Sequence, residues 1–110
     1  MLQRTHRLPG RTRLHQFRVY KTTAYTVKVA KNNLDYSRFG FIISKKVAKL
    51  SVDRNACRRK LRAGVEALFQ NIAPGYDFLF VITGNIADQS SNTLFETTKQ
   101  LLAQNGYITV

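Results

Sequence analysis

The residues best suited to chemistry with a partner are eight cations gathered between Ser44 and Arg62. This stretch reads SKKVAKLSVDRNACRRKLR and contains a single acid, Asp53. Its cations are Lys45, Lys46, Lys49, Arg54, Arg58, Arg59, Lys60 and Arg62. Charge runs are usually plain solvated surface, but ordinary surfaces mix both signs. The near absence of acids therefore favours a polyanion, most simply a nucleic acid, as the partner.

A helix from about Asp53 to Asn71 would display these cations on one side. Asp53 or Ser51 can cap it, and Pro74-Gly75 ends it. At about 100° per residue, one narrow apolar stripe forms. It consists of Cys57, Leu61, Gly64, Val65, Leu68 and Ile72. The opposite side carries Asn55, Arg59, Arg62 and Glu66, with Arg58 and Lys60 on the flanks.

Groups that could catalyse a reaction are scattered. Phosphodiester hydrolysis needs clustered carboxylates for metal ions, or a positioned histidine. The six acids occur singly, and His6 and His15 have no carboxylate nearby in the sequence. We interpret both histidines as solvent-facing or RNA-edge residues, and Cys57 as a buried small hydrophobe. The pattern predicts no catalytic group and no metal site in the protein itself.

Charge and length narrow the class of protein. The chain has 110 residues, a net charge of +12 and one cysteine. We expect one domain over residues 1–110, with a flexible basic arm at 1–13. Of its 18 cations, 14 lie in residues 1–21 and 44–62. The possible partners are RNA, DNA or an anionic membrane, and no apolar run approaches the ~20 residues of a spanning helix.

The N-terminus lacks the apolar segment of a secretory signal, so we read it as an RNA-contacting arm. A transit peptide would also be Arg-rich and poor in acids, and that alternative stays open. A lone cysteine indicates a reducing compartment. We expect a cytoplasmic protein without a membrane or small-molecule partner.

The first half of the chain predicts a helix followed by two strands. Thr12 can cap a short helix to about Tyr20, with an inward side formed by Leu14, Phe17 and Val19. Alternation predicts strands at 25–30 and 38–45, which we expect to pair as a hairpin.

The second half predicts a strand and a helix after the basic helix. Tyr76–Thr83 is almost continuously apolar, as expected in a sheet interior. The final helix should start near Ser91 or Asn92, stop at Asn105-Gly106, and bury Leu94, Thr98, Leu101 and Leu102. The fold class is α+β, a small sheet packed with helices. A crossover through the basic helix would normally be right-handed.

Aromatic residues near the cations are a second signal of RNA binding. Phe17, Tyr20, Tyr25 and Tyr36 could stack on unpaired bases. Core packing is the competing interpretation. It is equally good for Phe17 and better for Tyr25, which alternates with Val27 and Val29.

Four motifs together resemble the bacterial ribonuclease P protein component. They are HRL at 6–8, RFGFIISKKV at 38–47, RNACRRKLR at 54–62 and PGYDFLFV at 74–81. The resemblance implies the protein subunit of a ribonucleoprotein endonuclease that removes the 5′ leader of precursor tRNA. It also implies that the RNA subunit holds the catalytic Mg²⁺. The implied partners are the catalytic RNA and the precursor tRNA.

The resemblance also assigns residues and a fold. Contacts with the catalytic RNA fall on Lys45, Lys46, Arg54, Asn55, Arg58, Arg59 and Arg62. Contacts with the leader fall on Phe17, Tyr20, Lys28 and Ser44, in a cleft between the first helix and the sheet. The implied order is α-β-β-β-α-β-α, like ribosomal protein S5 domain 2, with a left-handed crossover through the basic helix.

Two other functions remain open at this point. A non-catalytic RNA-binding protein of the ribosome or of ribonucleoprotein assembly explains the charge equally well, but not the order of the motifs. A nuclease that acts without RNA would need a metal-binding or histidine-based site.

Overall fold

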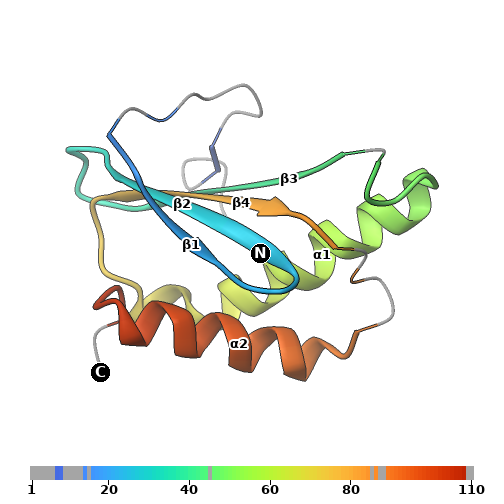
Figure 1. Cartoon of the computed structure of the whole chain (residues 1–110). Coiled ribbons are helices and arrows are strands. Elements are labelled where there is room, and N and C mark those ends of the chain that lie inside the picture. The colour runs from blue at the N-terminus through green and yellow to red at the C-terminus, as the bar shows by residue number, and fades with distance from the viewer. Residues whose placement is uncertain are drawn as a thin grey trace.

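A computed structural model describes residues 7–8, 14, 16–44, 46–84, 86 and 89–108. The predictions for His6, Thr12, His15, Lys45 and most of the arm at 1–13 lie outside these residues. Figure 1 shows a twisted sheet with both long helices on one side of it. The α+β class is confirmed.

Strand β4 (Tyr76–Ile82) is the centre of the sheet. Its neighbours are β2 (Tyr25–Lys31), which runs antiparallel to it, and β3 (Arg38–Ile43), which runs parallel. Strand β1 (Arg18–Lys21) pairs antiparallel with the other edge of β2, so the order is β1-β2-β4-β3. The prediction of an interior strand at 76–83 is confirmed, since Phe78, Phe80 and Ile82 are almost fully buried.

The predicted hairpin between the second and third strands is wrong, because β4 lies between them. The segment that connects β2 to β3 is bonded to the chain entering β4. The Asn32 amide donates to the Gly75 carbonyl (3.0 Å), and the Ser37 hydroxyl donates to the Ala73 carbonyl (2.7 Å). The alternation within each strand predicts which side chains face inward, but it does not indicate which strand lies next to it in the sheet.

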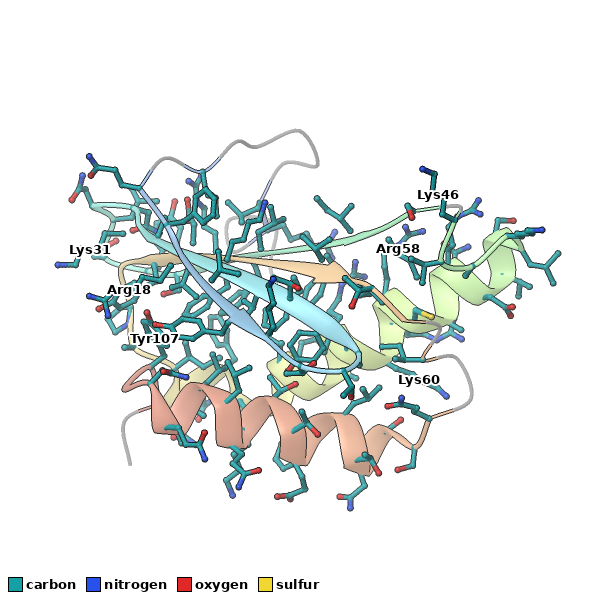
Figure 2. The ribbon with its side chains drawn as sticks, in the orientation of Figure 1. Arg18, Lys31, Lys46, Arg58, Lys60 and Tyr107 are labelled. Atoms are coloured by element: carbon teal, nitrogen blue, oxygen red, sulfur yellow. The ribbon has the colours of Figure 1, made fainter. Side chains whose placement is uncertain are left out.

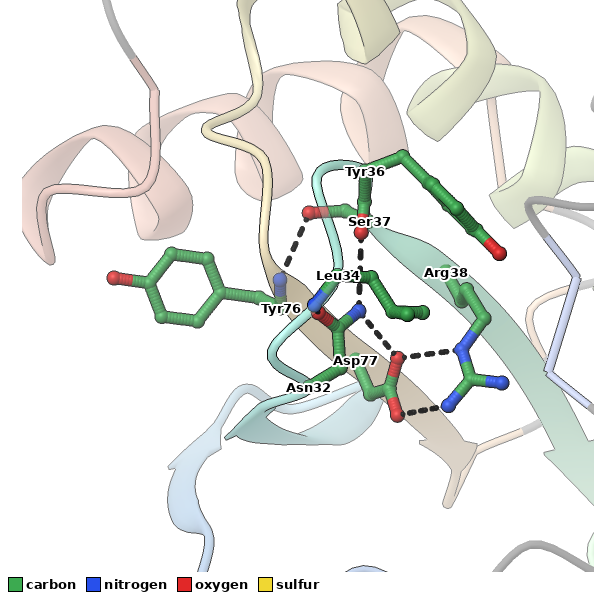
Figure 3. Close-up of polar contacts among 7 residues, drawn as sticks. All are labelled: Asn32, Leu34, Tyr36, Ser37, Arg38, Tyr76 and Asp77. Carbon is green, nitrogen blue, oxygen red and sulfur yellow. Dashed lines mark hydrogen bonds and ion pairs between the residues drawn. The ribbon is translucent and has the colours of Figure 1, made fainter.

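A buried carboxylate holds the entrance of β3 against β4. Asp77 accepts two bonds from the Arg38 guanidinium, at 2.9 and 2.7 Å, and one from the Asn32 side-chain amide at 2.9 Å (Figure 3). The hydrogen bonds to Asp77 raise the pKa of Arg38 above its usual value. The carboxylate of Asp77 is shielded from solvent, whereas the Arg38 side chain is 29% exposed. The bidentate pair fixes the relative position of the two strands.

Helix α1 (Ser51–Leu68) connects β3 to β4 and packs with the predicted stripe inward. Cys57, Leu61, Val65 and Leu68 are buried, and Gly64 lies where the backbone of the last helix approaches. A short 3-10 turn, η2 (Phe69–Asn71), follows the helix. The predicted cap at Asp53 or Ser51 is wrong, because the helix begins at Ser51 and both residues lie within its first turn. Leu50 holds the N-cap position without a side-chain bond.

The predicted helix between Thr12 and Tyr20 is wrong for the residues that the structure describes. Gln16 has a positive φ of 52°, which a right-handed helix cannot contain. Residues 18–21 form β1 instead, and Phe17 and Val19 are exposed rather than inward. The sequence RVYK is rich in β-forming side chains, and pairing with β2 satisfies its backbone. The three strands before α1 agree with the implied family order; the handedness of the crossover stays a prediction.

Helix α2 (Ser91–Gln104) confirms the prediction for the C-terminal region. The Ser90 hydroxyl caps it by accepting from the Thr93 amide at 3.1 Å. Leu94, Thr98 and Leu102 are buried, and Leu101 is half-buried. The Thr98 hydroxyl shares a 2.8 Å hydrogen bond with that of Tyr25 on β2, which ties the helix to the sheet.

We predict that Asp77→Ala lowers the free energy of unfolding by about 2–4 kcal/mol, because it leaves the Arg38 guanidinium without its carboxylate. Asp35→Ala removes the same charge from an exposed site on the β2–β3 connection and should change it by less than about 0.5 kcal/mol. Urea unfolding of the two variants measures the difference. Equal losses of unfolding free energy in the two variants would show that the change in net charge, and not the loss of the Arg38–Asp77 pair, causes the destabilisation.

Candidate nucleic-acid interface

The segment between β3 and α1 is held in shape by backbone and arginine contacts. The Ser44 carbonyl accepts from the amides of Val47 (3.1 Å) and Ala48 (3.3 Å). One nitrogen of Arg54 donates to the carbonyls of Ala48 and Lys49, each at 3.0 Å. Ala48 is buried, so the segment is anchored at its middle. Arg54, predicted to contact RNA, thus fixes the loop that carries exposed Lys46.

The remaining predicted side chains follow the outer side of α1. Asn55 and Arg59 are exposed, and Arg58 donates to the Asn55 side-chain oxygen. Arg62 is half-buried, with its guanidinium 5.6 Å from the centre of the Phe41 ring on β3. Figure 2 shows Lys46 and Arg58 at the same end of the molecule. We define the α1 basic surface as Lys46, Arg54, Asn55, Arg58, Arg59 and Arg62.

Two exposed apolar residues in this region were missed by the sequence analysis. Leu50 is 63% exposed and Val52 is 67% exposed, at the start of α1. The sequence did contain a signal for their exposure, because both residues are apolar and yet fall outside the apolar stripe of the helix. They give the α1 basic surface an apolar margin that can contact a ribose or base face. Lys60 has a different role, because its ammonium donates to the Gln89 carbonyl (2.8 Å) in the segment before α2.

The face of the sheet opposite the helices holds part of the predicted leader site. Directly paired residues share a face, so Val19, Lys28 and Leu79 form one row across β1, β2 and β4. The Lys28 ammonium lies 5.1 Å from the centre of the Phe17 ring. Phe17, Val19 and Ile42 are each more than a third exposed. This open face therefore offers a cation beside apolar surface, which suits an unpaired base and its phosphate.

The other two predicted leader residues do not join this pair. Tyr20 is directly paired with Val27, which places it on the helix-covered face, and its hydroxyl lies 2.9 Å from that of Tyr107. Ser44 is exposed at the end of β3, beside the α1 basic surface. Tyr25 is fully buried, as the core interpretation predicted.

Among residues whose positions the structure gives, no three His, Cys, Asp or Glu gather closely enough to hold a metal ion. None of the described helices is long and apolar enough to cross a membrane.

Comparisons with known proteins converge on one family. The family model described as Ribonuclease P matches residues 2–106. A ribonuclease P protein component from Caldanaerobacter subterraneus subsp. tengcongensis is 41% identical over 71 residues, or 64% of this chain and 60% of that protein. One from Pseudanabaena sp. is 31% identical over 86 residues, or 77% of this chain and 74% of that protein. The first match thus spans less than two thirds of the relative's length.

Solved structures show the same fold at low sequence identity. An RNase P protein mutant from Staphylococcus aureus with defective mRNA degradation activity superimposes with a TM-score of 0.74 at 18% identity. That superposition covers 84% of this chain and 78% of the other. The RNase P protein from Thermotoga maritima gives a TM-score of 0.62 at 22% identity, over 82% and 81% of the two chains.

We predict that Arg54→Leu frees the segment before α1, because two carbonyl acceptors lose their donor. Amide hydrogen exchange at residues 46–50 should accelerate, whereas exchange in β4 should not change. Arg59→Leu is the matched control, since it removes the same charge five residues later from an exposed position. Equal exchange in both variants would contradict a positioning role for Arg54.

Proposed function

Since the chain belongs to the ribonuclease P protein family, we propose that it is the protein subunit of a ribonucleoprotein enzyme that matures the 5′ end of tRNA. In this proposal it binds the catalytic RNA and the single-stranded leader of precursor tRNA in the cytoplasm. The RNA subunit holds the Mg²⁺ ions and performs the hydrolysis. The protein contributes binding and positioning.

The α1 basic surface is the observation that carries the proposal. Apolar packing of Cys57, Leu61 and Val65 holds α1 against the sheet, and Arg54 is the one cation of the surface that holds the loop before the helix. Exposed Lys46 and Arg59 are then available to neutralise phosphates, and counterion release favours such binding. Arg58 and Arg62 are oriented by Asn55 and Phe41, so that fewer rotamers are lost when they bind.

The open face supports the second part of the proposal, binding of the leader. The Phe17–Lys28 pair provides a ring for base stacking and an ammonium for a phosphate. Such contacts tolerate any base, as a subunit that serves many precursor tRNAs requires. The open face and the α1 basic surface are separated by the sheet edge at β3, so they can bind different RNA segments at once.

The test is cleavage of a 5′-extended precursor tRNA at low Mg²⁺ concentration. The protein alone, a bacterial ribonuclease P RNA alone, and both together are compared. We expect cleavage at the mature 5′ end only with both. Cleavage by the protein alone would show a nuclease that acts without RNA. Tight RNA binding without any gain in cleavage would favour another ribonucleoprotein.

We predict that Arg59→Gln weakens binding to the ribonuclease P RNA about fivefold at physiological salt and lowers the slope of log affinity against log salt by about one. The reason is the loss of one phosphate contact. Lys99→Gln, an exposed change on α2 with the same loss of charge, should leave both values almost unchanged. Filter binding over a range of salt concentrations measures them; identical slopes for the two variants would exclude Arg59 from the interface.

We predict that Lys28→Gln raises the KM of the assembled enzyme for a precursor with a long leader, because the leader loses an ammonium contact. The KM for a precursor with a one-nucleotide leader should not change. Steady-state cleavage of both substrates gives the comparison. The same increase for both would place Lys28 outside the leader path.

A further inference from the structure

A cationic pocket lies between the sheet and the end of α2, at the opposite end of the molecule from the α1 basic surface. Its volume is about 620 Å³, within the ~300–1,000 Å³ usual for small-molecule sites. Arg18 on β1 and Lys31 on β2 contribute its charges, and Tyr76 and Tyr107 form its aromatic wall. Figure 2 shows Arg18, Lys31 and Tyr107 together at one end, with Lys46 and Arg58 at the other.

The strand register brings the two cations together. Arg18 is directly paired with Val29, two residues before Lys31, so both side chains leave the same face of the sheet. Lys31 is in turn paired with Tyr76. Among the described residues neither cation has a hydrogen-bond or ion-pair partner, and no Asp or Glu lines the pocket. Two like charges thus lie on neighbouring strands, with no Asp or Glu beside them among the described residues, an arrangement that an anion would stabilise.

The wall of the pocket is polar at its edge and rigid. The Tyr76 and Tyr107 rings meet edge to face, with centres 5.1 Å apart, and the hydroxyl of Tyr107 is bonded to that of Tyr20. Burial raises the pKa of Tyr107 to about 12. Like any tyrosine hydroxyl it is neutral near pH 7, so it does not repel an anion. The half-buried ring of Tyr76 offers a surface on which a base can stack, and Asn33 adds an amide at the rim.

The end of α2 beside the pocket does not offset the positive charge of Arg18 and Lys31. A helix C-terminus carries partial negative charge on its unpaired carbonyls. Here those of Leu102 and Ala103 accept from the amides of Tyr107 and Gly106, and that of Leu101 accepts from the Asn105 side chain. The last turn is therefore largely satisfied, and Arg18 and Lys31 are the charged side chains among the described residues that line the pocket.

We propose that this pocket binds an unpaired ribonucleotide of an RNA strand, with its phosphate between Arg18 and Lys31 and its base against Tyr76. The inference rests on the RNA-binding function proposed above. It adds a second anchoring point to the α1 basic surface, so the protein would contact RNA at both ends of its long axis. The nucleotide can come from the leader or from the catalytic RNA.

Direct occupancy is tested by nuclear magnetic resonance with uridine 5′-monophosphate and with inorganic phosphate as probes. We expect the monophosphate to shift the backbone amides of Asn33 and Gly106, and to bind more tightly than phosphate because its base stacks on Tyr76. Shifts confined to α1 would overturn the pocket. Equal affinity for the two probes would overturn the nucleotide assignment.

The RNA source is tested with Arg18→Gln and Lys31→Gln, each compared with Lys99→Gln. Affinity is measured for a bacterial ribonuclease P RNA and for a short single-stranded leader oligonucleotide. We expect each pocket variant to weaken at least one of them about fivefold, and the affected probe identifies the strand. The thermal midpoint of each variant checks that the fold is retained.

The outcome separates this inference from the proposed function. If both pocket variants behave like Lys99→Gln while Arg59→Gln still weakens RNA binding, the pocket is overturned and the proposed function stands. If the pocket variants weaken binding but Arg59→Gln does not, the pocket stands and the α1 basic surface is the wrong interface.

Discussion

The fold depends on the burial of β4, whose apolar side chains require cover on both faces and a strand on each edge. β2 and β3 supply the edges, α1 and α2 cover one face, and Leu8 covers part of the other. Since β3 runs parallel to β4, the chain must return to the start of β4 through a crossover. That crossover is α1. The position of the basic helix is therefore a consequence of where an apolar strand has to lie.

The residues that stabilise the fold are largely different from the cations that are available for binding. The cations of the α1 basic surface contribute little to holding α1, which is kept in place by Cys57, Leu61 and Val65. A charge of +12 is unfavourable for a compact chain. Among the described residues, Arg38 forms an ion pair with Asp77, which is remote from that surface and nearly neutral as a unit. Exposed cations such as Lys46 and Arg59 are left for a partner, and binding to a polyanion would relieve the repulsion among the cations of the α1 basic surface.

Local patterns in the sequence predicted most elements but not their neighbours. The apolar stripe of α1, the alternation of β2 and the apolar run of β4 each predict the type of element correctly. The burial of one face, or of both faces, is enough to produce each pattern. The pairing of β2 with β4 could not be predicted in this way. It depends on the contacts of Asp77 with Asn32 and Arg38, which are distant from it in sequence. The helix predicted from Thr12 to about Tyr20, with Leu14, Phe17 and Val19 inward, is replaced by β1 because Phe17 and Val19 are exposed and residues 18–21 pair with β2. The pocket at Arg18 and Lys31 had no local signal, because it arises only when β1 and β2 pair beside the end of α2.

The contact between Leu8 and β3 also bears on how this chain avoids self-association. The Leu8 amide donates to the Phe39 carbonyl at 2.8 Å, and Arg7 forms a parallel bridge with Phe39. β3 is an edge strand rich in Phe and Ile, and an uncovered edge of this kind can template the addition of a strand from another copy. At the other edge, β1 is short and carries Arg18 and Lys21. Arg7 and Leu8 thus occupy part of one edge, and charged side chains flank the other, an arrangement that disfavours the addition of a strand from another copy.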